Sequence, residues 1–242
     1  MGETGREPPP KSPKKLLNLF VAFAEELVYT PKVLGDGGLG CGRRRRKAVI
    51  YRSTNRLILR EFQEEDWRDI HEYSCDARLT YYLNWGPNTD EQTKAFVKRA
   101  IRHQSEIPRT HFELAIVNSE ANRIVGNCRL VSIVHRDRSS ELHCIVRRED
   151  WGKGFGSEAI STLLAIGFED FKLHRIFSVV DPEDAVSARV LEKCGFQREG
   201  HLREHLWVKG QWRDSLLYAI LDYEWAQQTG RPIELELGDP VL

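Results

Sequence analysis

A glycine-dense turn that leads directly into an apolar, helix-periodic segment is the part of this 242-residue chain that points most directly to chemistry. Residues 151–159 read Trp-Gly-Lys-Gly-Phe-Gly-Ser-Glu-Ala. Glycine lets the backbone turn tightly and lets a ligand approach the main chain. The first N–H groups of the following helix have no intrahelical acceptor, and with the helix dipole they favour an anion. The turn therefore predicts a phosphate-binding loop.

The spacing of the glycines separates the kinds of phosphate loop that could be meant. A Walker loop needs a glycine five residues before its Gly-Lys pair and a Ser or Thr after the lysine, where this chain has Arg147 and Gly154. A dinucleotide loop, G-x-G-x-x-G, needs its third glycine at position 157, where Ser157 stands. The first of these is excluded and the second is disfavoured.

The loop and the segments around it resemble the GCN5-related N-acetyltransferase (GNAT) superfamily, and within it the RimJ/RimL-like branch. The pyrophosphate loop of that family reads (Gln/Arg)-x-x-Gly-x-(Gly/Ala), which residues 151–156 match at both glycine positions and depart from at Trp151. The resemblance extends from about Ser53 to Trp225. Its other parts are Arg56-Leu57-Ile58-Leu59-Arg60, Tyr82-Leu83-Asn84-Trp85-Gly86-Pro87, Asp184-x-x-Ser187, Val190-Leu191-Glu192-Lys193-Cys194-Gly195-Phe196, Glu199-Gly200-x-x-Arg203 and Gly210-x-x-x-Asp214.

This resemblance implies an α/β (α+β) fold with a mixed, mostly antiparallel central sheet and helices on both faces. It also implies acetyl-CoA as co-substrate, no metal, and direct attack by a primary amine in a ternary complex. The backbone N–H groups expected to hold the pyrophosphate belong to Gly152, Gly154, Gly156 and Ser157, and Lys153 either meets the phosphates or is simply exposed. The strand ending at Ile145 and Val146 is expected to bind the pantetheine arm, with the Val146 N–H as oxyanion donor.

The resemblance also identifies the positions that bear on the expected acid–base chemistry. Asp184 stands where the family has Asn, so it either contacts the cofactor or only caps a helix. Leu191 stands where many members have a proton-donating tyrosine, which leaves Ser187 or water to protonate the thiolate. Glu141 is the expected general base, with a structural carboxylate as the alternative. Glu113, Glu204 and His205 are lesser candidates.

The amine acceptor is limited by the free energy of deprotonation. At pH 7 a lysine with a pKa of ~10.4 costs about 4.6 kcal/mol to deprotonate, whereas an α-amine near ~7.8 costs about 1.1 kcal/mol. This difference favours a protein N-terminus, as in the RimJ/RimL branch, or a small-molecule amine. The alternatives are a polyamine, antibiotic or amino acid acetyltransferase, and a non-catalytic acyl-CoA sensor or scaffold.

Charge and composition place the catalytic region in one domain. Residues 1–50 carry ten Lys/Arg and five Asp/Glu, whereas residues 51–242 carry 26 and 31. The acidic balance disfavours nucleic-acid binding. The basic run Arg43–Lys47 is either an RNA or ribosome contact or a solvated linker.

The five cysteines are scattered without a zinc or disulfide pattern, which favours the cytoplasm. No segment is apolar enough to span a membrane, and a homodimer is left open.

Periodicity predicts alternating strands and helices. We expect a basic extension over 1–50, the catalytic domain over 54–228 and a tail over 229–242. The substrate entrance is expected between the helices of Glu65–Ile107 and the turn at Lys209, with Tyr81, Tyr82 and Trp85 either lining it or packed in the core. The expected strands are Arg56–Glu61, Phe112–Val117, Arg123–Val134, Ser140–Val146, Arg175–Val180, Gln197–Val208 and Trp212–Asp222, and the helices Glu65–Cys75, Thr89–Ile107, Ser157–Phe171 and Asp184–Lys193.

Overall fold

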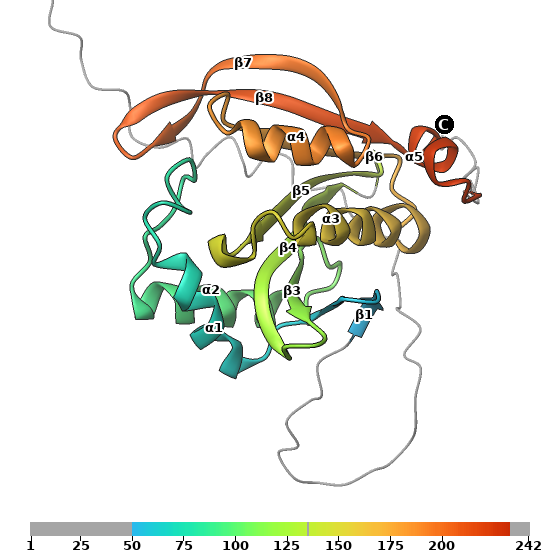
Figure 1. Cartoon of the computed structure of the whole chain (residues 1–242). Coiled ribbons are helices and arrows are strands. Elements are labelled where there is room, and N and C mark those ends of the chain that lie inside the picture. The colour runs from blue at the N-terminus through green and yellow to red at the C-terminus, as the bar shows by residue number, and fades with distance from the viewer. Residues whose placement is uncertain (1–49, 135, 233–242) are drawn as a thin grey trace, which may run out of the picture. The chain divides into compact units, whose positions relative to one another are not determined.

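The computed structural model describes residues 50–134 and 136–232. These residues form one eight-stranded sheet in the order β1-β2-β3-β4-β5-β6-β8-β7 (Figure 1). The strands are β1 Ile50–Ser53, β2 Leu57–Glu61, β3 Phe112–Asn118, β4 Arg123–Val134, β5 Ser139–Val146, β6 Arg175–Val180, β7 Gln197–Val208 and β8 Gln211–Leu221. The helices are α1 Trp67–Ser74, α2 Asp90–His103, α3 Phe155–Ala165, α4 Ala185–Lys193 and α5 Asp222–Thr229. The basic run Arg43–Lys47 lies outside the described residues.

Every neighbouring strand pair is antiparallel except β5 with β6, which is parallel. The mixed, mostly antiparallel sheet expected from the resemblance is therefore confirmed. The long β7–β8 hairpin forms one end of the sheet and passes over α4 in Figure 1, away from α1 and α2.

The two faces of the sheet bury two separate hydrophobic clusters, because side chains alternate between faces along each strand. On β3, Leu114 and Ile116 belong to the larger cluster, which includes the apolar face of α3 and Leu191 of α4. Ala115, between them, belongs to the smaller cluster with residues of α1 and α2. The helices thus cover both faces, with α1 and α2 opposite α3 and α4.

Several element boundaries differ from those expected. The helix predicted to end at Ile107 ends at His103, since the chain turns ahead of Pro108 and a residue before proline disfavours the helical region. The helix predicted from Ser157 begins two residues earlier, at Phe155. Gly195 ends α4 with φ +91°, as predicted. The sheet also includes β1, which precedes the expected domain start at residue 54, and α5 follows directly on β8.

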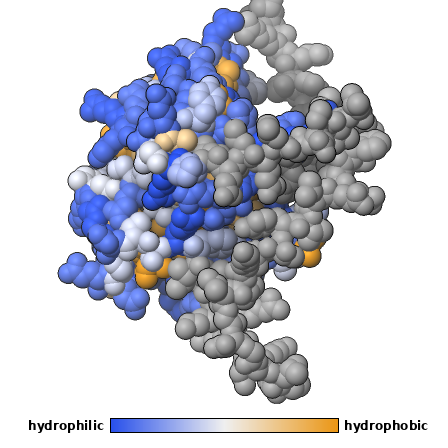
Figure 2. All heavy atoms as spheres, turned by 90° about the vertical axis from the view of Figure 1, so that its right-hand side faces the viewer, coloured by the Kyte–Doolittle hydropathy of each residue, from blue (hydrophilic) through white to orange (hydrophobic). Residues whose placement is uncertain are grey.

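The surface of the described residues is mostly polar. On the face shown in Figure 2, hydrophilic residues predominate and hydrophobic ones appear singly or in small groups. Among the residues described, no helix combines the length and apolar character needed to cross a bilayer. The visible part of this face therefore presents no broad apolar docking surface.

Candidate active site

Strands β5 and β6 diverge and leave a wedge in the middle of the sheet. Their pairing covers only Ser139–Glu141 against Arg175–Phe177, although β5 continues to Val146 and β6 to Val180. The backbone of residues 142–146 therefore has no strand partner on this side. Since buried backbone groups are almost always hydrogen-bonded, the wedge is a ready place for an extended ligand. Its closed end lies at Glu141.

Alternation along β5 decides which backbone groups face the wedge. The Arg147 N–H donates to the Val125 carbonyl of the β3–β4 side at 2.8 Å, so it points away from β6. Because backbone groups of successive residues point to opposite sides of a strand, the N–H of Val146 points into the wedge and that of Ile145 does not. The same alternation turns the N–H groups of Cys144 and Leu142 toward the wedge. Of the two residues expected to bind the pantetheine arm, only Val146 has its backbone groups suitably placed.

Trp151, the residue at which the loop departs from the family pattern, contacts strand β5. Its indole Nε1 donates to the Val146 carbonyl at 2.7 Å while half of its surface stays exposed. The carbonyl points the same way as the Val146 N–H, so the indole occupies an acceptor at the mouth of the wedge. The tryptophan therefore satisfies a group that an extended ligand would otherwise bind.

The Trp151→Phe variant tests this competition. If a ligand amide must displace the indole N–H from Val146, removing that donor should tighten coenzyme A binding about fivefold, which corresponds to one net hydrogen bond of about 1 kcal/mol. Isothermal titration of coenzyme A measures the change, with Trp212→Phe as the control at another exposed tryptophan. Weaker binding in Trp151→Phe would instead make the indole a ligand contact.

The glycine loop lies at the mouth of the wedge and starts α3. Gly152 and Gly154 have φ +76° and +82°, a region that side chains other than glycine rarely adopt. A Cβ added at Gly152 would meet nothing within 4 Å, and one at Gly156 would make only ordinary contacts with the Val146 and Val190 side chains at 3.7 and 3.9 Å. Open space above the loop and the free N–H groups at the start of α3 suit a pyrophosphate.

The buried carboxylate of Asp150 anchors this loop. Both of its oxygens accept hydrogen bonds from Arg123 Nη2, at 3.0 and 3.1 Å. Lys153 Nζ donates to the same carboxylate at 2.7 Å, and Arg147 Nε lies 3.8 Å from it. Asp150 is 2% exposed. Lys153, expected either at the phosphates or free on the surface, is thus half-exposed and paired inside the loop. Asp150 joins the loop to β4 and, through Arg147, to Glu72 of α1.

Asp184 and Ser187 form a helix cap. Asp184 accepts from the Ser187 N–H at 3.0 Å and from its hydroxyl at 2.6 Å, at the start of α4. Of the two roles expected for Asp184, the structure shows the capping one. The Ser187 hydroxyl proton is directed at this carboxylate, so its donation to a thiolate would require the hydroxyl to rotate. Leu191 is the buried residue of α4 and packs in the larger hydrophobic cluster.

At the closed end of the wedge, Glu141 pairs with His143. Glu141 Oε1 lies 3.3 Å from His143 Nε2, and both residues project from the α1–α2 side of β5. Burial raises the pKa of Glu141, but His143, Arg129 and His205 more than offset this, so its pKa lies below the usual range. Glu141 is therefore a carboxylate at neutral pH beside an imidazole, a pair able to accept and hold a proton.

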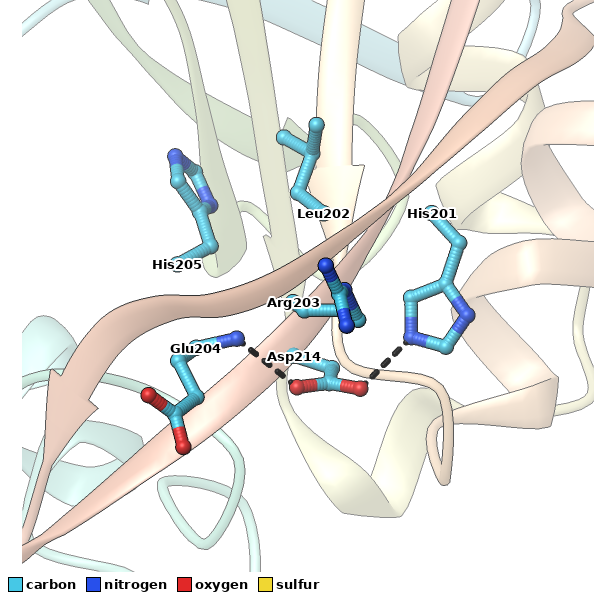
Figure 3. Close-up of a pocket in the computed structure, with 6 residues that line it drawn as sticks. All are labelled: His201, Leu202, Arg203, Glu204, His205 and Asp214. Carbon is cyan, nitrogen blue, oxygen red and sulfur yellow. Dashed lines mark hydrogen bonds and ion pairs between the residues drawn. The ribbon is translucent and has the colours of Figure 1, made fainter.

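A bulge in β7 brings His205 near this pair. Between Leu202 and Leu206 the strand has more residues than its partner β8, and Glu204 adopts φ +48°. Figure 3 shows Asp214 accepting from the Glu204 N–H and pairing with His201, while His205 points away from Asp214. His205 instead bonds Ser215 at 3.0 Å. Bulges often redirect side chains beside active sites.

Sequence reasoning did not single out His143 or Arg129. Arg129 of β4 lies between Glu113 and His143 in the register, so the three share one sheet face. The available signal for His143 was its position two residues after Glu141 on a strand, which places both on the same face. Arg129 could be found only from the strand register.

A splayed strand with a glycine loop at its open end and a carboxylate–imidazole pair at its closed end is the arrangement expected of an enzyme that transfers an acyl group from a coenzyme A thioester. Residues 56–197 match the model of the acetyltransferase (GNAT) domain family. The chain is 30% identical over 173 residues to the N-acetyltransferase YnaD of Bacillus subtilis, covering 72% of this chain and 98% of that relative. The chain belongs to the GNAT family and is an N-acetyltransferase that uses acetyl-CoA.

Other relatives differ in their acceptors. The crystal structure of spermidine N-acetyltransferase from Vibrio cholerae in complex with CoA and spermine matches with a TM-score of 0.63 and 25% identity, covering 71% of this chain and 99% of that one. The ribosomal protein uS5-alanine N-acetyltransferase of Escherichia coli is 24% identical, covering 72% of this chain and 91% of that relative. The relatives of this chain therefore include both a spermidine and a ribosomal-protein acetyltransferase.

Proposed function

We propose that this enzyme acetylates a small-molecule primary amine by direct attack in a ternary complex, with the reaction taking place at the closed end of the β5–β6 wedge. The observation that carries the proposal is that strand pairing stops at Glu141. The carboxylate–imidazole pair therefore lies on the α1–α2 face of the sheet, beside the closed end of the wedge whose mouth carries the glycine loop. One ligand spanning the wedge would reach both.

The length of β5 places the proposed base, Glu141, far from the Val146 N–H, which the sequence analysis expected to be the oxyanion donor. Val146 is five residues along the strand from Glu141, a span of about 17 Å at roughly 3.3 Å per residue. If Glu141 is the base, the reacting carbonyl group lies near Glu141. The Val146 N–H is then too far away to donate a hydrogen bond to the oxygen of that carbonyl group. We assign Val146, with Gly152, Gly154, Gly156 and Ser157, to holding the cofactor. The oxyanion donor is then the N–H of Cys144 or Leu142.

Proton removal is assigned to Glu141 with His143. Because the pKa of Glu141 is lowered, the carboxylate is a weak base by itself and acts best on an amine that is already easily deprotonated, or through the adjacent imidazole. A water or Ser187 supplies the proton to the departing thiolate. Neither assignment requires a metal.

The entrance for the amine is formed by the segment after α1 and the tip of the β7–β8 hairpin. Lys209 Nζ donates to the Thr80 carbonyl, and the Arg213 guanidinium lies 5.8 Å from the centre of the Tyr82 ring. These contacts tie the hairpin to the aromatic segment and restrict the opening. A restricted entrance, together with the spermine-bound relative, favours a slender amine such as a polyamine over a folded protein.

A protein N-terminal α-amine is the second candidate. It is supported by the low deprotonation cost of an α-amine and by the ribosomal-protein relative. An acetyl-CoA turnover screen over polyamines, N-terminal peptides, amino acids and aminoglycosides separates the candidates. Turnover confined to peptides would overturn the small-molecule assignment, and coenzyme A binding without turnover on any amine would favour a non-catalytic sensor. We further propose a cytoplasmic location, where acetyl-CoA is supplied.

Direct attack predicts that Cys144→Ala keeps most of its turnover. Burial raises the pKa of Cys144 to about 12, so the thiol beside the wedge is not a thiolate at neutral pH and cannot carry the acetyl group. We expect kcat within about threefold of the parent enzyme, because the variant loses only packing. Mass spectrometry after incubation with acetyl-CoA alone should find no acetyl-enzyme. A stable acetylated Cys144 would contradict direct attack.

A further inference from the structure

A cluster of metal-ligand side chains lies between α2 and the start of β3. His103 is the last residue of α2, Glu106 follows in the next turn and His111 directly precedes β3. One ligand atom from each lies within 4.8 Å of the others. The two imidazole rings are tilted by 35°, with their centroids 4.7 Å apart. Their separation in the chain matches no common zinc motif, so this cluster is created by the fold.

Two buried polar atoms in this cluster lack a hydrogen-bond partner. His103 Nδ1 and Glu113 Oε2 are both in this condition and lie 3.9 Å apart. His103 is 8% exposed and Glu113 is 2% exposed. A buried polar group without a partner costs about 1–3 kcal/mol. A ligand that draws the imidazole toward this carboxylate would remove the cost for both.

In each of the two imidazoles, Nδ1 faces a polar group outside the three proposed ligands, and Nε2 is left to bind a metal. His111 Nδ1 is hydrogen-bonded to the Thr110 hydroxyl at 2.9 Å, which leaves Nε2 available. His103 Nε2 faces Glu106 Oε1 at 4.0 Å, while Nδ1 faces Glu113. Two imidazoles and one carboxylate form a donor set typical of zinc, with one position left for water.

We propose that His103, Glu106 and His111 bind a divalent transition metal of the zinc class. In this site Glu113 accepts a hydrogen bond from His103 Nδ1–H and orients the imidazole, as carboxylates do behind metal-bound histidines. Glu113 is itself held by Arg129 Nη1 at 3.5 Å, which balances its charge and makes it an outer partner instead of a ligand.

Binding requires only a modest contraction of the cluster. Metal–nitrogen distances of about 2.0–2.1 Å place tetrahedral ligands about 3.4 Å apart, so the widest gap must close by roughly 1.4 Å. The Glu106 side chain is 39% exposed in the turn after α2 and can rotate.

The site adjoins the Glu141–His143 pair without using its residues. Glu113, Arg129 and His143 are successive neighbours across β3, β4 and β5. Metal binding can therefore be measured whatever the acceptor is. Its failure would leave the proposed acetyl transfer intact.

Equilibrium dialysis of the full chain against Zn²⁺ tests the proposal. We expect one ion per chain, and Co²⁺ in its place should give the intense visible absorption of a tetrahedral site. Because His103 is buried and its loss could disturb folding, the ligand variants are Glu106→Gln and His111→Gln. Each should weaken binding by more than about 100-fold, and Glu113→Gln by about 10–100-fold.

His174→Ala is the control, since His174 is a half-exposed histidine outside the cluster. It should bind Zn²⁺ as the parent does. Circular dichroism without metal should show that the ligand variants keep the parental fold. No bound ion in the parent, or unchanged affinity in both Glu106→Gln and His111→Gln, would overturn the proposal.

Discussion

Replacing Glu141 by Gln is expected to lower kcat by about 10²–10⁴-fold, the usual contribution of a positioned general base. The amide keeps the size of the side chain but cannot accept the proton, and it cannot stabilise a protonated His143 at 3.3 Å. Coenzyme A affinity should change little, since Glu141 lies at the far end of the wedge from the phosphate loop. Steady-state kinetics and coenzyme A titration measure the two effects separately.

Glu199→Gln is the matched control for this variant. Glu199 is also a strand glutamate whose pKa is lowered by a basic partner, here Arg175, but it lies on the β7 edge. It should retain nearly full turnover. A loss below about threefold in Glu141→Gln, with a large loss in His143→Gln, would move the base from the carboxylate to the imidazole.

The pH dependence follows from the direction of the Glu141 pKa. An ordinary glutamate titrates near ~4.3, and a lowered pKa keeps Glu141 ionised throughout pH 5–9. Any rise of kcat/KM with pH in that range must come from the acceptor amine or an imidazole. The stability that this ionised group contributes is present above about pH 4.3 and is lost as the pH falls through its lower folded value.

Asp150→Asn is expected to lower the free energy of unfolding by about 3 kcal/mol. Removing the charge from a buried ion pair typically costs about 3–5 kcal/mol, and the lower end applies because Arg123 and Lys153 are partly exposed and can be solvated. The loop also loses its anchor, so KM for acetyl-CoA should rise. Urea denaturation and steady-state kinetics measure these changes.

The neighbouring Glu149→Gln serves as the control for Asp150. Its carboxylate also contacts Arg147, at 3.2 Å, but its side chain is 72% exposed. Exposed ion pairs contribute about 0–1 kcal/mol, so stability should be almost unchanged. Equal destabilisation by the two variants would show that Asp150 does not anchor the loop.

The sequence alone predicted the glycine turn ahead of α3, the order of most elements and the GNAT family. These features are local: the glycines at 152 and 154 permit positive φ, and Gly195 ends α4. The loop's role in holding the cofactor, and Glu141 as base, stay predictions. The four-residue β1 escaped prediction because so short a segment carries little periodic signal, and its place is set by pairing with β2. The helix α5, which follows β8 directly, was not predicted either.

Only the tertiary structure decided which side chains meet. The Glu141–His143 pair gains Arg129 and His205 because strand register and the β7 bulge bring them from β4 and β7. The cluster of His103, Glu106 and His111 likewise depends on how α2 ends beside β3. Local backbone preference acts over a few neighbouring residues, whereas the register that places distant side chains together is set by packing of the whole sheet.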